Sequence, residues 1–306
     1  MTAATIYTTR TTPDGFIIVA VLWISAALAT LVSIYAIYIS DTANAFTLHD
    51  DQLKSEALVS AALELTAYQL TATAGPSRPT HGGFNFRLGK ANIAVSFQSE
   101  AARIDLNTAP KELLAGLFAM LDTADKAANY ADEIVRWRTP PAKDQGSSLA
   151  NQGRNTPDAA AAALFAHVDE LSLVPGLPTT VVEQALPFVT VYSGRPQVNI
   201  VEAAPTVLAA LPGMVKDRLD AVLEQRQVGA DGQALLQLLG PARNYATTEA
   251  SNAARVNVHI AYDNGHRSDS QVIILPFDEG TEPYAVLSSQ DALQPATDEP
   301  AGIAWR

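Results

Sequence analysis

The five histidines are the side chains best suited to acid–base catalysis or metal binding, and their spacing indicates neither. None of them forms an HExxH pattern, and only the last two lie close together in the sequence; they are His49, His81, His167, His259 and His266. The chain also has no GxSxG nucleophile elbow, Walker loop or GxGxxG loop. It has no cysteine, which excludes disulfides, cysteine-bound zinc and thiol catalysis. These observations predict a protein without enzymatic activity.

Calcium is the one ion for which the sequence offers a candidate set of ligands. Hard cations prefer oxygen ligands, and four suitable side chains lie on one polar loop: Asp144, Asn151, Asn155 and Asp158. Their spacing matches no EF-hand, and a solvated linker has the same composition. We therefore expect no cofactor and keep these four residues as calcium candidates.

Two turns, 173–177 (LVPGL) and 211–214 (LPGM), are typical of helix-hairpin-helix units. Such units often hold DNA phosphates through backbone amides. No cation accompanies the first turn, and Lys216 and Arg218 beside the second are offset by neighbouring carboxylates. The formal net charge of −12 also repels phosphate. We expect packing units and no nucleic acid, with a membrane-anchored binding module of the DNA-uptake type as the alternative.

A candidate for proteolytic processing lies at residues 13–16 (PDGF). A short polar leader ends at Gly15, and Phe16 opens an apolar run that continues to Ser40 without a charge. This arrangement resembles a type IV prepilin site, at which a membrane peptidase cuts between the Gly and the aromatic residue. At about 1.5 Å per residue, the run spans about 37 Å, enough to cross a hydrocarbon core of about 30 Å.

Two other interpretations of the apolar run remain. It could be a plain signal anchor, or a secretory signal cleaved after Ala27-Leu28-Ala29, which fits the small-residue rule. The run continues well past Ala29, however, and Arg10 is the only cation of the leader. The prepilin interpretation is therefore favoured over both.

The apolar run is expected to continue into an amphipathic helix. No Pro or Gly occurs between Asp41 and Thr73, and Gly75-Pro76 then ends the helix. Apolar residues recur on one predicted face at Phe46, Leu53, Ala57, Ala61, Leu65 and Tyr68. The sequence thus predicts one long helix over residues 16–74, with its membrane-spanning part at 16–40.

The flanking charges indicate the orientation of this anchor. Arg10 precedes it, whereas Asp41, Asp50 and Asp51 follow it. We therefore expect a single-pass membrane protein whose N-terminus is cytoplasmic and whose C-terminal body is exported.

Two groups of alternating strands frame a helical block. The first group is expected at 84–88 and 93–97 around a Gly89-Lys90 turn, and the second at 256–260, 271–275 and 284–287. We predict an α+β fold with four parts: a leader at 1–15, the helix at 16–74, a sheet domain at 75–104 and 241–306, and an inserted helical domain at 105–240.

The helical block contains an imperfect internal repeat. Residues 104–110 (IDLNTAP) and 198–205 (VNIVEAAP) each lead through Ala-Pro into an apolar helix, and the second copy has one extra residue before its Pro. Pro at the first helical turn costs no hydrogen bond. Thr108 is expected to act as an N-cap.

Together these segments resemble the type II secretion minor pseudopilin K family over nearly the whole chain. The motifs are the Gly15-Phe16 site and residues 103–110, 132–138 (DEIVRWR), 168–176 (VDELSLVPG), 191–194 (VYSG) and 211–213. The resemblance implies a pilin-like fold, a long N-terminal helix packed on an antiparallel sheet, with a large all-α insertion. It also implies cleavage after Gly15 by prepilin peptidase and N-methylation of Phe16.

The resemblance further implies a non-enzymatic subunit that initiates or caps the periplasmic pseudopilus. The expected partners are the minor pseudopilins I and J, pseudopilin H and the major pseudopilin. In most pilins, the fifth mature residue is a Glu that neutralises the N-terminal ammonium of a neighbouring subunit. Here that residue is Ala20. A subunit with nothing above it has no amine to neutralise, so Ala20 fits a tip position.

Overall fold

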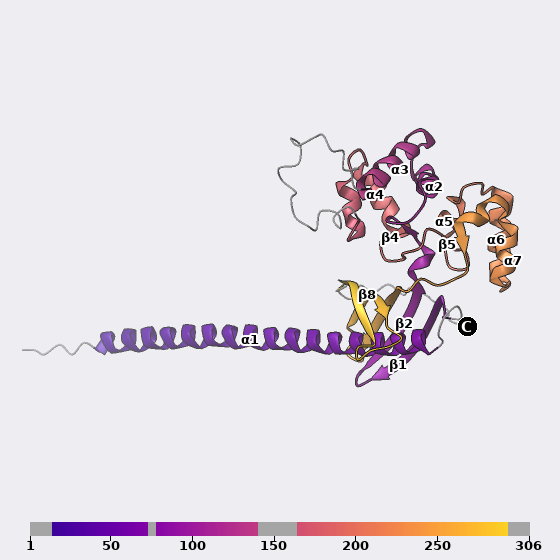
Figure 1. Cartoon of the computed structure of the whole chain (residues 1–306). Coiled ribbons are helices and arrows are strands. Elements are labelled where there is room, and N and C mark those ends of the chain that lie inside the picture. Colours follow the sequence, from indigo (N-terminus) through magenta and orange to yellow (C-terminus); the bar gives the residue numbers. More distant parts are fainter. Residues whose placement is uncertain (1–13, 73–77, 140–163, 293–306) are drawn as a thin grey trace, which may run out of the picture. The chain divides into compact units, whose positions relative to one another are not determined.

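The computed structural model describes residues 14–72, 78–139 and 164–292 (Figure 1). The chain divides into two compact units, residues 1–57 and 58–306, which are described separately. The Gly75-Pro76 stop signal, most of the leader and the end of the C-terminal tail lie outside the described residues.

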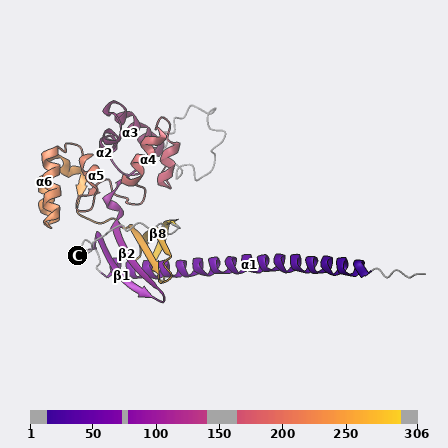
Figure 2. The same ribbon diagram turned by 180° about the vertical axis from the view of Figure 1, so that it is seen from behind.

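Helix α1 runs without interruption from Asp14 to Thr71 (Figures 1 and 2). It begins two residues before Phe16, so the Gly15-Phe16 bond lies in the helical backbone. Its segment Ile18–Ile39 is long and apolar enough to cross a membrane. The hydroxyl groups of Thr30 and Ser33 donate to carbonyls one turn earlier in the same helix. These two hydroxyl groups are therefore hydrogen-bonded within the helix, as a hydrocarbon environment favours.

The second unit contains a five-stranded antiparallel sheet with the order β1-β2-β7-β8-β9. Its strands are β1 (His81–Leu88), β2 (Ala91–Ser99), β7 (Ala254–Tyr262), β8 (Arg267–Pro276) and β9 (Tyr284–Ala292). Every strand expected from alternation is present. Gly89, with φ +60°, provides the predicted β1–β2 turn. The two halves of the sheet are joined through β2 and β7, which pair Val95 with Val258.

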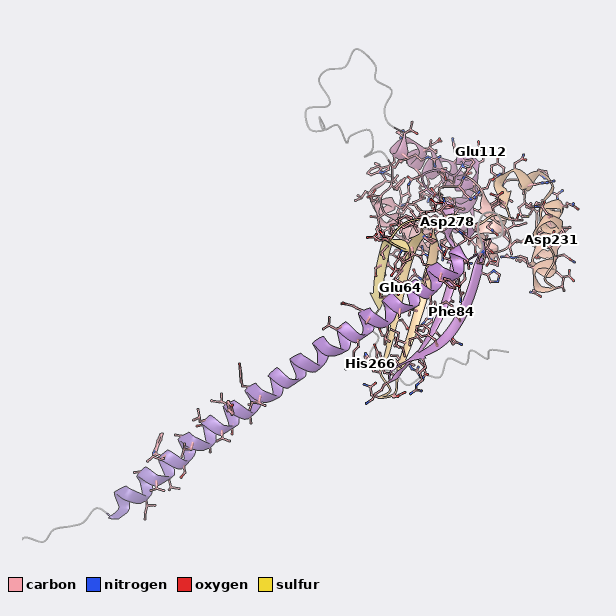
Figure 3. The ribbon with its side chains drawn as sticks, turned by 60° about the horizontal axis from the view of Figure 1, so that its bottom comes forward. Glu64, Phe84, Glu112, Asp231, His266 and Asp278 are labelled. Carbon is pink, nitrogen blue, oxygen red and sulfur yellow. The ribbon has the colours of Figure 1, made fainter. Side chains whose placement is uncertain are left out.

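One face of the sheet is covered by the last turns of α1. Ile93, Val95 and Phe97 alternate inward from β2, and they pack with Val256 and Val258 of β7. The helix contributes Leu58, Ala62, Leu63, Ala67 and Leu70 to this core. Figure 3 shows this part of α1, marked by Glu64, alongside the strands.

The predicted apolar face of α1 is not the face that packs against the sheet. Leu65 is 42% exposed and Tyr68 is 72% exposed, whereas Leu63 and Leu70 are buried. The helix carries Ala and Leu on two opposite faces, and both faces satisfy a spacing of three and four residues. The face whose Leu and Ala side chains fit against β2 and β7 is buried by the sheet, and the predicted face remains exposed to solvent.

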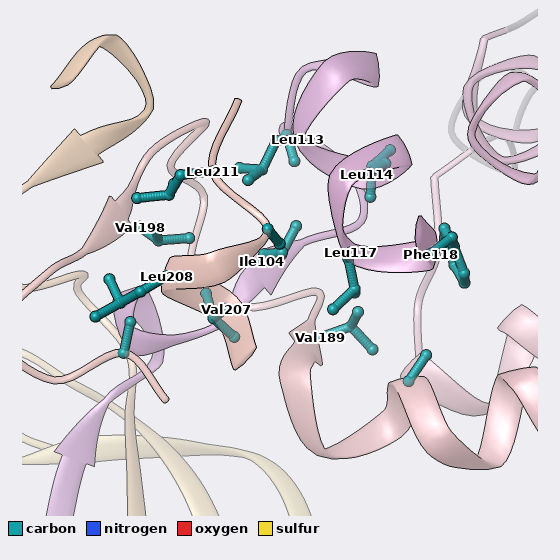
Figure 4. Packing of buried hydrophobic residues seen from close by; sticks show 14 of the residues in the cluster. Ile104, Leu113, Leu114, Leu117, Phe118, Val189, Val198, Val207, Leu208 and Leu211 are labelled. Carbon is teal, nitrogen blue, oxygen red and sulfur yellow. The ribbon is translucent and has the colours of Figure 1, made fainter. Parts of the chain in front are cut away.

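Between β2 and β7 lies a mainly helical block. Its helices are α2 (Lys111–Leu121), α3 (Ala124–Arg138), η4 (Val168–Leu173), α4 (Thr179–Ala185), η5 (Leu186–Phe188), α5 (Pro205–Ala209), α6 (Lys216–Gln227), α7 (Gly232–Leu238) and η6 (Gly240–Tyr245). They enclose a core separate from that of the sheet, in which Leu117 of α2 lies near Val189 and Leu113 of α2 lies near Leu211 (Figure 4).

Two short parallel strand pairs close this block, and the sequence analysis did not predict them. Strand β3 (Ile104–Asp105) pairs with β4 (Val189–Thr190), and β5 (Val198–Asn199) pairs with β6 (Ala246–Thr247). Each pair joins the first residues of a repeat to a strand that follows the helices of that repeat, and on this basis we extend the two repeats to residues 104–195 and 198–247. A two-residue strand is too short to show alternation, which explains why the sequence pattern missed it.

The two repeats share the same hydrogen bonds. The backbone N–H of Ala109 donates to the Asp105 carbonyl, and that of Ala203 donates to the Asn199 carbonyl, both at 2.9 Å. Pro110 then caps α2 and Ala204 caps α5, so Pro205 becomes the first helical residue. The extra residue of the second copy therefore shifts the proline into the helix and leaves the turn unchanged.

The expected N-cap role of Thr108 is wrong. Pro110 occupies the N-cap of α2 without a side-chain hydrogen bond. The Thr108 hydroxyl instead donates to the Arg195 carbonyl at 2.7 Å. Thr108 lies two residues before the cap, and its side chain joins the two ends of the first repeat.

Candidate functional site

Three features could position this protein in an assembly: the start of α1, the solvent face of α1, and the junction between the helical block and the sheet. At the start of α1, Gly15, Phe16 and Ala20 lie on one helix, with Ala20 about one turn after Phe16. Ala20 is half-buried. No Asp, Glu, Lys or Arg occurs from Phe16 to Ser40, so this segment has no charged side chain.

The solvent face of α1 carries the apolar residues that the sheet leaves uncovered. In the second unit these are Ala61, Leu65 and Tyr68, which follow one another at spacings of four and three. Such a spacing places them on one stripe of the helix. We call these three residues the outer stripe. An exposed apolar stripe of this kind is suited to packing against another helix.

At the junction, a fully buried carboxylate joins the helical block to the sheet. Glu100, which follows β2, is 0% exposed. Arg255 of β7 donates to it from Nε at 2.8 Å, and Arg103 donates from its guanidinium at 3.4 Å. The hydroxyl of Thr190 in β4 donates to the other carboxylate oxygen. Glu100 thus connects β2, β7 and the first repeat within one network.

A second carboxylate joins the helical block to the edge of the sheet. Glu202, in the turn between β5 and α5, accepts a hydrogen bond from the Thr80 hydroxyl at 3.1 Å and lies 2.5 Å from His81. The Gln98 side-chain amide donates to the Glu202 backbone carbonyl at 3.1 Å. On the other edge strand, β9, Ser288 lies within 3.4 Å of His167. The block therefore contacts the sheet at its centre and at both edge strands.

Each repeat fixes its turn with a buried side chain and an arginine. The Asp105 carboxylate accepts hydrogen bonds from the backbone N–H groups of Asn107, Thr108 and Gly194. Arg138 of α3 donates to the carbonyls of Leu106 and Ala109 in the same turn. Burial raises the pKa of Asp105, and the backbone hydrogen bonds oppose this rise. Burial also lowers the pKa of the Arg138 guanidinium.

The second repeat has the same arrangement with an uncharged side chain. Asn199 accepts a hydrogen bond from Val201 N–H at 2.8 Å. Arg226 of α6 donates to the carbonyls of Val201 and Ala203. These arginines hold the turns that precede α2 and α5, so the motif at 132–138 serves to stabilise the motif at 103–110.

The described histidines form no metal-binding cluster. His259 lies 2.7 Å from Asp269 within the sheet, and the His266 ring packs near Tyr262. No group of three or more His, Asp or Glu side chains that could hold a metal is found among the described residues. The calcium candidates Asp144, Asn151, Asn155 and Asp158 lie outside the described residues, so calcium binding stays a prediction.

Glu100, Arg255 and Glu202 are the junction residues that sequence reasoning missed. Their only signal is a charged residue next to an alternating strand, as with Glu100 after Ser99 and Arg255 in β7. Charged residues flank strands in many solvent-exposed positions, so this signal does not distinguish a buried partner from a surface one.

Comparison with protein families identifies the segment that contains Glu100. Residues 91–194 match the family described as type II secretion system (T2SS), protein K. The resemblance of this chain to protein K is confirmed. The match includes Glu100 and the motifs at 103–110, 132–138, 168–176 and 191–194. The Gly15-Phe16 site and the motif at 211–213 lie outside it.

The fold is also similar to that of a solved structure. A chain of the crystal structure of the GspK-GspI-GspJ complex from the enterotoxigenic Escherichia coli type 2 secretion system superposes with a TM-score of 0.53. The two chains share 18% sequence identity, and the match covers 80% of the present chain and 98% of the other. A search of curated proteins gave no match. The combination of helices with an antiparallel sheet is therefore shared with a chain of that complex.

Proposed function

We propose that this chain is a minor pseudopilin of a type II secretion system, with a structural role and no catalytic one. The main observation behind this proposal is a charge-free apolar segment, Ile18–Ile39, that continues as one helix into the core of a sheet domain. The protein K match at 91–194 supports the same role. The segment Ile18–Ile39 holds the chain in the inner membrane, and the sheet domain and its helical insertion lie in the periplasm.

The proposal includes processing and a position in the fibre. Prepilin peptidase cleaves between Gly15 and Phe16, and Phe16 is then N-methylated. Because Ala20 replaces the carboxylate that would pair with the terminal ammonium of a neighbouring subunit, the chain occupies the tip, where it initiates or caps the pseudopilus. The domain boundaries of this proposal remain 75–104 and 241–306 for the sheet, and 105–240 for the insertion.

The proposed partners are the minor pseudopilins I and J, together with pseudopilin H and the major pseudopilin. The similar structure is that of a complex of GspK with GspI and GspJ. The outer stripe offers a helix face for such contacts, because Leu65 and Tyr68 are exposed on the side of α1 away from the sheet. The acidic body and the absence of a cationic surface run are consistent with protein partners and no nucleic acid.

The test is the N-terminus of the native protein. Protein purified from cells with prepilin peptidase should start at Phe16 and carry one added methyl group, as seen by N-terminal sequencing and intact mass. Protein from cells without the peptidase should keep the leader. A mature chain that begins anywhere else would overturn the proposal. Co-purification with pseudopilins I and J in mild detergent tests the partners separately.

A further inference from the structure

The turn between β7 and β8 contains the single Asn-Gly step of the chain, Asn264-Gly265. Residues 263–267 are exposed. Gly265 has φ +85°, and a side chain at this position would have nothing within 4 Å. Gly265 has no side chain of its own to crowd its backbone nitrogen, whereas every other asparagine in the sequence is followed by a residue that has one.

A local hydrogen bond ties the Asn264 side chain to the backbone on the far side of Gly265. The backbone N–H of His266 donates to Asn264 Oδ1 at 3.0 Å. This bond spans Gly265, so it holds the side-chain carboxamide against the backbone of the residue that would attack it. It also withdraws electrons from the carbonyl, which makes its carbon more electrophilic. The Gly265 N–H is itself bonded to the Tyr262 carbonyl at 3.0 Å, and this exposed bond must open before reaction.

We propose that Asn264 is a site of spontaneous cyclisation and deamidation in the folded protein. The Gly265 nitrogen loses its proton to water and attacks Asn264 Cγ, forming a C–N bond. The Cγ–Nδ2 bond breaks, and Nδ2 leaves as ammonia with the proton returned to it. The resulting succinimide ring is opened by water at either carbonyl, which gives aspartate or isoaspartate. Water is the only co-reactant, and nothing is oxidised or reduced.

The product changes the charge and length of this turn. Deamidation adds one negative charge to a formal net charge of −12. The charge appears next to Asp263, whose carboxylate already binds Arg87 of β1 at 2.8 Å. Isoaspartate also adds a backbone atom between Tyr262 and His266, whose N–H and carbonyl close the hairpin at 2.9 Å. The modification therefore loosens the end of the β7–β8 hairpin in older molecules.

The test uses the full chain in detergent, incubated under mildly alkaline conditions and then digested with trypsin. Cleavage after Arg255 and Arg267 gives one peptide, 256–267, that contains both Asn264 and Asn257. Asn257 lies within β7 and is followed by Val258, so it serves as an internal control. Fragmentation should locate the amide-to-acid mass change at Asn264, at a rate about tenfold or more above that at Asn257, because opening of the turn is easier than opening of the sheet.

Two further measurements decide the outcome. The Asn264→Gln variant should keep its amide, since the longer side chain disfavours ring closure, and an isoaspartate-specific methyltransferase should label only the wild-type chain. The same incubation in urea gives the rate for the unfolded chain. If Asn264 reacts in urea but stays intact in the folded protein, or if Asn264 and Asn257 react at equal rates, the proposal is wrong.

Discussion

A methyl group placed on Gly116 would lie 1.9 Å from the carbonyl oxygen of Ala210. Gly116 belongs to α2 in the first repeat, and Ala210 caps α5 in the second. The two repeats therefore meet backbone against backbone, at the centre of the core that contains Leu117 and Leu208 (Figure 4). No L-side chain fits between these elements without separating them.

Gly116→Ala should destabilise the helical block. The added methyl group must displace the Ala210 carbonyl, because the clash is with backbone and cannot be relieved by a rotamer change. We expect a loss of about 1–3 kcal/mol in the free energy of unfolding. Urea unfolding followed by circular dichroism measures it. Glu112→Ala, at an exposed position of the same helix, is the control and should change stability little. Equal stability of the two variants would contradict this contact.

The alternating strands were predictable because each has one buried face, as Ile93, Val95 and Phe97 show in β2. The buried face of α1 was not predictable, because Leu65 and Leu63 lie on opposite sides of an Ala-rich helix and both fit a helical spacing. Tertiary fit against the sheet, and not periodicity, decides which of them is buried. The same limit hides β3 and β5, whose pairing depends on residues more than 40 positions away.

The candidate site was predictable only in part. The motif residues around Asp105 and Arg138 were found as sequence patterns, but their mutual role, an arginine that holds the turn before α2, required coordinates. Glu100 could not be found, because a single buried carboxylate has no periodic signal and its partners Arg255 and Thr190 are distant in sequence.

Glu100→Ala should separate the helical block from the sheet. Removing the carboxylate leaves Arg255, Arg103 and the Thr190 hydroxyl without their shared acceptor. Breaking a buried pair by removing one partner costs about 3–5 kcal/mol. The control is Glu249→Ala, which removes an exposed carboxylate that pairs with Arg195; it should cost no more than about 1 kcal/mol. Thermal unfolding of both variants tests the difference, and similar losses would refute the role of Glu100.

Asp105 should make stability depend on pH. Burial raises its folded-state pKa above the usual 3.8. Since the folded state then holds the proton more tightly than the unfolded state, the stability that Asp105 contributes is fully present below pH 3.8 and is lost as pH rises through the folded pKa. The variant Asp105→Asn has at this position the same amide side chain as Asn199 in the second repeat, and an amide does not titrate. The stability difference, wild type minus variant, should fall as the pH is raised from below 3.8 through the folded-state pKa. Urea unfolding across this range measures it, and a difference that grows with pH would contradict the assignment.

Substitutions on the outer stripe should weaken assembly without unfolding the protein. Leu65→Asp and Tyr68→Ser remove apolar surface that faces solvent, away from the buried Leu63 and Leu70. We expect the melting temperature to be unchanged and co-purification of pseudopilins I and J to drop by about tenfold, as expected for the loss of a buried anchor. Ser60→Asp, an added charge on another side of the same helix, is the matched control. A stripe variant that retains its partners as well as this control does would exclude this face as the interface.

Ala20→Glu tests the tip position within the proposed function. A carboxylate four residues after Phe16 is stable in the membrane only if a neighbouring terminal ammonium neutralises it, and an unpaired charge there costs roughly 2.5–3.5 kcal/mol. A subunit at the tip has no neighbour above it, so the Glu should stay unpaired and impair incorporation and secretion. Ala20→Gln, polar but uncharged, should be tolerated better, and immunoblots of the membrane fraction should show equal amounts of both variants after cleavage. Crosslinking to pseudopilins I and J and assay of the secreted proteins give the readout. Wild-type assembly and secretion with Glu at position 20 would mean that a partner amine is present, and the tip position would have to be abandoned.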